Sequence, residues 1–269
     1  MSYNGITPAF QADNASSILA TRSNLIMVYL FDIDGTLTPP RQRMRHDALH
    51  DFLSWSKDKK IFLVAGSDID KIHEQLPASA LTRCEGIFCC MGNEFRKGNG
   101  IIYQNEFDPP AALRELLVSR QMYGGFPVEA KRGGRGEIFE FRTGMLNFTT
   151  IGRNADAEER NRYYKWDKKH KERSGIAKEV EEKFPELEAR LGGQISIDIQ
   201  PKGNNKSQAS KWVRENLRER MFFFGDKCEE GGNDYDIALD ITKSGDGKIF
   251  RVKDDRDTME VLNKLGSEE

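Results

Sequence analysis

The sequence predicts an α/β protein in which a doubly wound, parallel-sheet, Rossmann-like core carries an inserted α+β domain made of an antiparallel sheet and helices. Three observations support this prediction. Short apolar runs alternate with helical stretches in both outer parts of the chain. The middle has strands that alternate polar and apolar residues instead. The length of 269 residues is enough for one large domain or two ordinary ones.

The core strands are marked by apolar runs that are too short for lone helices. The first run ends at Phe31 and is followed at once by Asp, Gly and Thr, which is typical of a buried strand that ends in a loop. The predicted strands cover residues 25–31, 61–65, 86–90 and 221–224. Predicted helices cover residues 44–59, 68–76 and 206–220. Strands that alternate with helices in this way indicate a parallel sheet.

The middle of the chain has a different pattern. Residues 137–142 and 194–199 alternate polar and apolar side chains, as half-exposed antiparallel strands do. Helical stretches over residues 110–122 and 155–184 would cover one face of that sheet. We therefore expect a core made of residues 24–94 and 201–269, an inserted domain at residues 95–200, and a flexible extension at residues 1–23.

Composition excludes several kinds of partner. The 41 Lys and Arg against 43 Asp and Glu give a net charge of -2, so no global basic field favours nucleic acid or an anionic membrane. No stretch approaches the roughly 20 apolar residues of a membrane span, and residues 1–23 lack the features of a signal peptide. The four cysteines lack the number and spacing of a disulfide scaffold or metal site. We expect a cytoplasmic protein with reduced thiols and neither a nucleic-acid nor a membrane partner.

Two carboxylates, Asp32 and Asp34, follow the first predicted strand at its carboxyl end, which is the active-site edge of a doubly wound sheet. Residues two apart in an extended chain point the same way, so one carboxylate can act as nucleophile while the other handles the proton. Gly35 permits the turn, and Thr36 can hydrogen-bond the group that the carboxylates hold. The alternative is a plain Asp-Gly turn after a strand.

Further polar residues follow in order at the ends of core strands or the starts of core helices. Ser67 offers a hydroxyl and adjacent backbone donors to a phosphate, or is an ordinary helix N-cap. Lys206 begins a helix, which disfavours a cation unless an anion lies there too; the alternative is a solvated lysine. Two more acids follow the last predicted strand. Four carboxylates in one cleft would repel unless a divalent cation held them, and Mg²⁺ suits such oxygens. The predicted magnesium ligands are Asp32, Asp34, Asp226 and Asp234.

The order Asp-x-Asp-Gly-Thr, Ser, Lys, Gly-Asp and Asn-Asp resembles the haloacid dehalogenase superfamily of phosphotransferases. A closer resemblance, from about residue 28 to residue 262, is to the eukaryotic-type phosphomannomutases. The motifs that carry it are LFDIDGTLTPPR at 30–41, EFRTGMLN at 140–147, IGR at 151–153, GGQISID at 192–198, and FFGDK with GGND at 223–227 and 231–234.

This resemblance implies roles for individual residues. Asp32 would be the phosphorylated nucleophile and Asp34 the general acid/base, with Ser67 and Lys206 completing the catalytic set. The substrate would be held by Arg41, Arg132, Arg142, Arg153, Ser196 and Asp198. Arginines in the inserted domain make physical sense, because a mutase must also hold the phosphate that it is not transferring. The resemblance further implies Mg²⁺, a hexose bisphosphate activator, and a homodimer formed through the inserted domain, which is the cap of this family.

Three segments depart from the family pattern. Residues 91–94 replace a Glu-Asn-Gly turn at the junction between core and cap, and residues 202–205 replace an Asp-Gly-Trp-Asp segment before the lysine. The loop at residues 131–136 is longer than the family's, so either Arg132 or Arg135 could face the substrate.

The leading hypothesis is a phosphosugar mutase that interconverts mannose 6-phosphate and mannose 1-phosphate, or the glucose phosphates, through an aspartyl-phosphate and a hexose bisphosphate. The alternatives are a sugar-phosphate phosphatase of the same superfamily and a non-catalytic sugar-phosphate sensor. The sequence does not separate mannose from glucose, because the two epimers differ at one hydroxyl.

Overall fold

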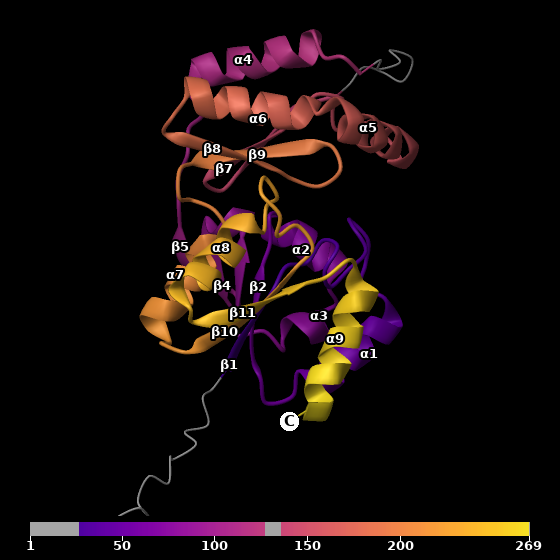
Figure 1. The fold of residues 1–269 in the computed structure, drawn as a ribbon, viewed down its shortest axis with the longest axis vertical. Coiled ribbons are helices and arrows are strands. Elements are labelled where there is room, and N and C mark those ends of the chain that lie inside the picture. Colours follow the sequence, from indigo (N-terminus) through magenta and orange to yellow (C-terminus); the bar gives the residue numbers. More distant parts are fainter. Residues whose placement is uncertain (1–26, 127–135, 269) are drawn as a thin grey trace, which may run out of the picture.

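The computed structural model describes residues 27–126 and 136–268, which form two separate sheets (Figure 1). One sheet has seven strands in the order β11-β10-β1-β2-β3-β4-β5. The other has four strands in the order β6-β7-β9-β8. A parallel-sheet core beside a separate antiparallel sheet confirms the predicted fold class.

The larger sheet is parallel from β11 to β3 and antiparallel at the edge where β4 and β5 form a hairpin. Its strands are β1 (Met27–Phe31), β2 (Lys60–Val64), β3 (Gly86–Cys89), β4 (Glu94–Lys97), β5 (Gly100–Gln104), β10 (Arg220–Gly225) and β11 (Gly247–Arg251). The four predicted core strands correspond to β1, β2, β3 and β10. Strand pairing also assigns residues 94–104 to this sheet, although the sequence prediction placed residues 95–104 in the inserted domain.

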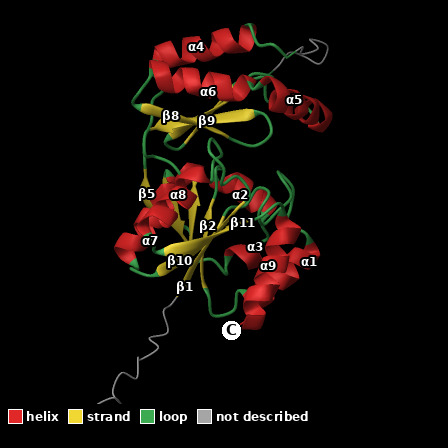
Figure 2. Cartoon of the chain, viewed as in Figure 1, coloured by secondary structure: helices red, strands yellow, loops and turns green. Residues whose placement is uncertain are grey.

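Helices cover both faces of the larger sheet, as a doubly wound fold requires (Figure 2). They are α1 (His46–Trp55), α2 (Ile69–Gln75), α3 (Ala78–Leu81), α7 (Ser207–Asn216), α8 (Tyr235–Ser244) and α9 (Asp255–Glu268), with a short 3₁₀ turn at Cys90–Gly92. Tyr29 and Phe31 of β1 pack in the cluster that contains residues of α1 and α9. Val28 and Leu30 pack in the cluster that contains residues of α7 and α8. The central strand is therefore buried on both faces, which fixes the position of the residues that follow it.

The smaller sheet carries helices on one face only and turns its other face toward the core (Figure 1). Its strands are β6 (Phe139–Arg142), β7 (Met145–Thr149), β8 (Leu187–Leu191) and β9 (Ser196–Pro201), and its helices are α4 (Ala111–Met122), α5 (Ala157–His170) and α6 (Glu172–Lys183). Leu146 and Phe148 of β7 pack in one apolar cluster with residues of α4 and α6. Asn147 lies between them and points to the opposite face, as strand alternation requires. The core-facing surface of this sheet is therefore polar.

The helix predicted over residues 155–184 is two helices in the structure. The break is at Lys171, whose left-handed backbone has φ 59°. Asp167 holds the turn, because its carbonyl accepts from the Lys171 amide at 2.7 Å and its carboxylate accepts from the Arg173 amide at 2.9 Å. The buried carboxylate of Asp167 therefore satisfies an amide in the first turn of α6, just after the break.

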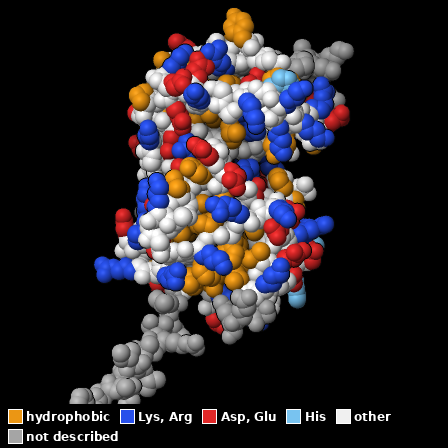
Figure 3. Space-filling model, in the orientation of Figure 1, with side chains coloured by type: hydrophobic (Ala, Val, Ile, Leu, Met, Phe, Trp, Pro, Cys, Tyr) orange, Lys and Arg blue, Asp and Glu red, His pale blue; other side chains and the backbone are white. Residues whose placement is uncertain are grey.

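Within the described residues, no helix is both long and apolar enough to cross a membrane. Figure 3 shows Lys and Arg side chains intermixed with Asp and Glu over the face in view. This mixture agrees with the net charge of -2.

Candidate active site

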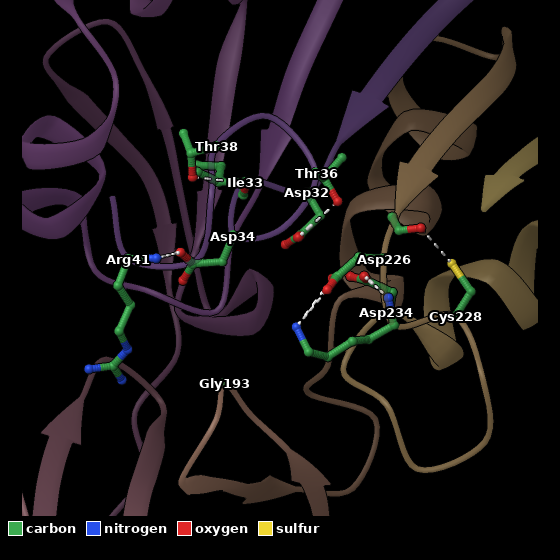
Figure 4. A network of polar contacts seen from close by, with 12 residues as sticks. Asp32, Ile33, Asp34, Thr36, Thr38, Arg41, Gly193, Asp226, Cys228 and Asp234 are labelled. Carbon is green, nitrogen blue, oxygen red and sulfur yellow. Dashed lines mark hydrogen bonds and ion pairs between the residues drawn. The ribbon is translucent and has the colours of Figure 1, made fainter. Parts of the chain in front are cut away.

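The carboxyl ends of β1 and β10 bring the predicted acids together at one edge of the core sheet (Figure 4). Phe31 pairs with Phe224 in the parallel register, and the Asp32 amide donates to the Phe224 carbonyl at 2.9 Å. Asp32 and Asp226 thus follow neighbouring strands. Thr36 donates its hydroxyl to Asp32 Oδ2 at 3.3 Å, so the turn after β1 folds back onto the first carboxylate.

Three carboxylates form a compact group. Asp32, Asp226 and Asp234 each offer an oxygen, and these oxygens lie within 4.8 Å of one another. Two glycines leave room for the group. A Cβ at Gly35, where φ is +88°, would lie 2.5 Å from Asp226 Oδ2, and a Cβ at Gly225 would lie 2.7 Å from Asp234 Oδ2. Hard carboxylate oxygens at this spacing fit Mg²⁺, so three of the four predicted ligands are brought together.

The carboxylate of Asp34, the fourth predicted ligand, lies outside that group. Its Oδ1 accepts from the Arg41 amide at 2.7 Å and from Gln75 Nε2 at 2.6 Å. Arg41 has left-handed backbone with φ 57°, which is uncommon for a residue with a side chain. A carboxylate fixed by two N–H donors beside the nucleophile suits proton transfer better than metal ligation.

Lys206 is fully buried and lies among the acids. Its ammonium donates to Asp32 Oδ1 and to Asp234 Oδ1, the latter at 2.7 Å. Burial lowers the pKa of Lys206, but the carboxylates of Asp234 and Asp32 outweigh burial and raise it. Burial and Asp234 raise the pKa of Asp32, against the opposing effect of Lys206. The lysine is therefore a buried counter-ion of the acid group, not a solvated side chain.

The two altered segments keep firm local structure. Asn205 accepts from the Ser207 amide at 3.0 Å and donates to Glu188 Oε1 at 2.7 Å, which holds the chain just before and after Lys206. At the other junction, Asn93 Nδ2 donates to the Cys90 carbonyl at 2.8 Å. Asparagine side chains thus fix both segments, but residues 91–94 join β3 to β4 within the core sheet, and the chain crosses to the smaller sheet only after β5.

Ser67 lines the cavity between the two sheets, and the helix cap next to it is a different residue. The N-cap of α2 is Asp68, whose carboxylate accepts from the Lys71 amide at 3.0 Å. The Ser67 carbonyl accepts from the Cys90 amide at 2.9 Å. The alternative of an ordinary N-cap at Ser67 is therefore wrong, and its hydroxyl is available to a ligand.

The inserted domain contributes Arg142, which lines the same cavity, and Arg153, which follows β7 and shares Glu140 with it. Arg142 donates to the Gly66 carbonyl at 2.7 Å and to Glu140 Oε2 at 2.8 Å, and lies 4.0 Å from Asp198. Arg153 donates to the side chain of Asn147 and is paired with Glu140. The Nε atoms of both arginines are buried without a hydrogen-bond partner among the described residues. These unmet donors favour an anionic ligand.

Electrostatics support the same conclusion. Burial and the neighbouring charges of Arg142 and Arg41 lower the pKa of Arg153 to about 10, although Glu140 acts in the opposite direction. Burial would raise the pKa of Glu140, but the cations around it lower the value to about 2. Arg142, Arg153 and Lys71 therefore share one carboxylate, and a bound phosphate would relieve the repulsion between the cations.

Predicted residues from both sheets meet in one cavity. Its lining includes Asp32, Asp34, Arg41, Ser67, Arg142, Ser196 and Asp198. Asp198 is buried and accepts from Asn147 Nδ2. A Cβ at Gly192 would lie 2.6 Å from Ser196 Oγ, so the glycine pair before β9 leaves space there. Arg132 and its alternative Arg135 lie outside the described residues.

Four polar side chains of this cavity were not assigned a role from the sequence: Gln75, Asn147, Lys227 and Asn233. Lys227 donates to both carboxylate oxygens of Asp226, at 3.2 and 2.9 Å, and its amide donates to Asp234 Oδ2 at 3.0 Å. Strand alternation within β7 could have indicated Asn147, and Lys227 directly follows a predicted ligand. Nothing in the local sequence marks Gln75, which reaches the site only through the packing of α2.

The cap and core also touch away from the cavity. Arg190 of β8 donates to both carboxylate oxygens of Asp236, at 2.7 and 3.2 Å. The Leu191 amide donates to the Gly231 carbonyl at 3.1 Å. These contacts tie the smaller sheet to the loop that carries Asp234.

Solved structures share this fold at low sequence identity. An IMP-bound mutant of IMP-nucleotidase from Plasmodium falciparum matches with a TM-score of 0.62 at 14% identity, over 91% of this chain and 68% of that chain. A haloacid dehalogenase-like hydrolase from Bacteroides thetaiotaomicron matches with a TM-score of 0.54 at 11% identity, over 89% of this chain and 99% of that chain.

Sequence comparisons are more specific. Phosphomannomutase 1 of Dictyostelium discoideum is 36% identical over 247 residues, which cover 88% of this chain and 96% of that protein. The phosphomannomutase of Saccharomyces cerevisiae is 34% identical over 241 residues, covering 88% of this chain and 92% of that protein. A family model described as eukaryotic phosphomannomutase matches residues 49–267. With charged residues from both sheets lining one cavity and relatives aligned over nearly their whole length, the chain belongs to the eukaryotic phosphomannomutase family.

Proposed function

We propose that this protein is a phosphosugar mutase that interconverts mannose 6-phosphate and mannose 1-phosphate, with the corresponding glucose phosphates as a second substrate pair to be assayed beside them. One observation carries the proposal. Asp32, which belongs to the acid group around Lys206, lines the cavity from the core side, and Arg142, which shares Glu140 with Arg153, lines it from the cap side. Two poles of this kind suit a substrate that carries a phosphate at each end during the reaction.

The reaction begins with the phosphoryl group on Asp32. A hydroxyl oxygen of the hexose monophosphate attacks phosphorus, the bond from phosphorus to Asp32 breaks, and Asp34 takes the hydroxyl proton. The product is a hexose bisphosphate. After it reorients, Asp32 attacks the other phosphate, and Asp34 returns the proton to the departing sugar oxygen. Asp32 is phosphorylated again, and the isomeric monophosphate leaves.

Core residues would stabilise the charge that this transfer develops. The ammonium of Lys206 contacts Asp32 and is buried, so its attraction is little screened by water. Ser67 adds a hydroxyl beside the same cavity. Asp32, Asp226 and Asp234 would hold Mg²⁺, which neutralises phosphoryl oxygens when bound.

Cap residues would hold the phosphate that is not being transferred. Arg142 and Arg153 have buried donors left for it, and Arg41 adds a third guanidinium from the core. Ser196 and Asp198 supply polar groups that could hydrogen-bond sugar hydroxyls. Both phosphates of the intermediate would thereby be fixed while it is bound.

Family membership leads us to expect a hexose bisphosphate activator and a homodimer through the cap. We also expect a cytoplasmic location, which the free thiols of Cys84, Cys89, Cys90 and Cys228 support. The names of the curated relatives favour a mutase over the sugar-phosphate phosphatase and the non-catalytic sensor.

A coupled assay of mannose 1-phosphate, with and without a hexose bisphosphate, tests the proposal. Isomerisation and free phosphate are recorded together, and glucose 1-phosphate is assayed in parallel. Isomerisation should exceed phosphate release and should be lost in Asp32→Asn and in excess chelator. Asp108→Asn is the matched control, because that side chain is 96% exposed. Phosphate release without isomerisation would make the protein a phosphatase instead.

A further inference from the structure

Gln75 is buried at the end of α2 and reaches the second carboxylate of the site. Its side chain donates from Nε2 to Asp34 Oδ1 at 2.6 Å, and the residue is 7% exposed. The helix ends there because Leu76 is extended and precedes Pro77. A buried polar side chain needs a hydrogen-bond partner, and the carboxylate of Asp34 is one for Gln75.

Both hydrogen bonds to Asp34 end on the same oxygen. The Arg41 amide and Gln75 Nε2 donate to Oδ1, and among the described residues no group donates to Oδ2. A protonated carboxyl carries its hydrogen on one oxygen, and an oxygen that already accepts two N–H bonds is a poor place for it. The arrangement therefore leaves Oδ2 to carry and deliver the proton.

Gln75 also fixes the loop that presents the other donor. Its carbonyl accepts from the Met44 amide at 2.8 Å, and its Nε2 lies 3.5 Å from Thr38 Oγ1. Both ends of the loop from Thr38 to Met44 thus contact one residue. Arg41 lies inside this loop in its left-handed conformation, which persists only where surrounding structure holds it.

From this geometry we propose that Gln75 is a positioning residue for proton transfer: it fixes Asp34 so that Oδ2, and not Oδ1, exchanges a proton with the sugar oxygen. The inference rests on the proposed function, because it assigns Gln75 a part in that reaction. It concerns the orientation of one carboxylate and requires no contact between Gln75 and the substrate.

Substrates that differ in their need for a proton test this role. A sugar oxygen leaves with a proton from Asp34, whereas the nitrophenolate of para-nitrophenyl phosphate leaves without one. The first-turnover burst of nitrophenolate measures phosphorylation of Asp32 alone. Hexose phosphate turnover measures phosphorylation together with proton transfer.

Gln75→Met keeps the length of the side chain and removes its N–H donors. We expect kcat for mannose 1-phosphate to fall about ten- to a hundredfold, a part of the roughly 10²- to 10⁴-fold typical of general acid/base catalysis. KM and the nitrophenolate burst should stay within about twofold to threefold of wild type if phosphate binding and the nucleophile are intact. Gln75→Glu, which keeps the shape but replaces the donor with an acceptor, should show the same split.

Glu74→Met is the matched control, because Glu74 is the exposed neighbour of Gln75 on α2. It should behave as wild type in both assays. An equal loss of burst and hexose phosphate turnover in both Gln75 variants would make the residue merely structural and overturn the proposal, as would an unchanged kcat. If the wild type does not isomerise hexose phosphates, the proposed function is refuted instead. The role of Gln75 would then be tested by comparing the loss of hexose phosphate hydrolysis with the loss of the nitrophenolate burst.

Discussion

Replacing Lys206 with Met tests the buried charge group directly. The ammonium is fully buried and donates to two carboxylates, so Lys206→Met leaves Asp32 and Asp234 without their shared counter-ion. Removing one partner of a buried ion pair typically costs about 3 to 5 kcal/mol. We expect the lower end at pH 7, because burial and Asp234 raise the pKa of Asp32 against the opposing effect of Lys206; removing the lysine raises that pKa further, and proton uptake at Asp32 then limits the cost.

Urea unfolding in excess chelator measures this loss as a change in the free energy of unfolding. A loss of about 3 kcal/mol should lower the thermal midpoint by roughly 6 to 12 °C. Saturating Mg²⁺ should stabilise the variant more than the wild type, because the ion takes over the neutralising role of the lysine. Lys211→Met, an exposed lysine of α7, serves as the control. A loss below about 1 kcal/mol in chelator, or equal stabilisation of both proteins by Mg²⁺, would refute this account of the acid group.

Three further predictions concern the cap. Arg142→Ala or Arg153→Ala should lower kcat/KM for hexose phosphates by about ten- to a hundredfold, since a charge-assisted hydrogen bond contributes about 1.5 to 3 kcal/mol. The kcat/KM for para-nitrophenyl phosphate should stay unchanged, and equal losses on both substrates would contradict a phosphate-binding cap. Glu140→Gln should destabilise the protein at neutral pH. Because the pKa of Glu140 is lowered from 4.5 to about 2, the extra stability of the wild type is fully present above pH 4.5 and should shrink as pH falls toward 2. Urea unfolding across that range measures this difference, and a difference that does not change with pH would argue against the ion pairs. Arg190→Met should raise KM up to about fivefold, because the two hydrogen bonds from Arg190 to Asp236 join cap and core. An unchanged KM would show that this contact does not help to hold the cap against the core.

Much of the core could be predicted because its strands are local apolar runs. The run at residues 25–31 and the following acids specify a strand and its catalytic edge without distant information. The edge hairpin of β4 and β5 could not be placed, because Glu94–Gln104 contains polar, apolar and glycine residues without a clear period. Its membership of the core sheet depends on pairing with β3, which is a tertiary property.

The site was predictable where function depends on short motifs and less so where it depends on packing. Asp32, Asp226 and Asp234 come from three short motifs, and they meet because β1 and β10 are neighbours in the sheet. The separate environment of Asp34 depends on Gln75, which comes from another helix and belongs to no motif. Side-chain partners drawn from distant elements are thus the part that sequence patterns leave open.

The pairing of Lys206 with Asp32 also has a consequence for synthesis of the chain. The two residues are 174 positions apart, so at about 5 to 20 residues per second the ribosome needs roughly 9 to 35 s to supply the lysine after the aspartate. The elements of the smaller sheet are contiguous in the chain and are complete before β10 emerges. During that interval β1 lacks its neighbour β10 and presents an open strand edge. The nascent core is therefore most exposed to misassociation while the cap is already able to fold, and the catalytic group is assembled last.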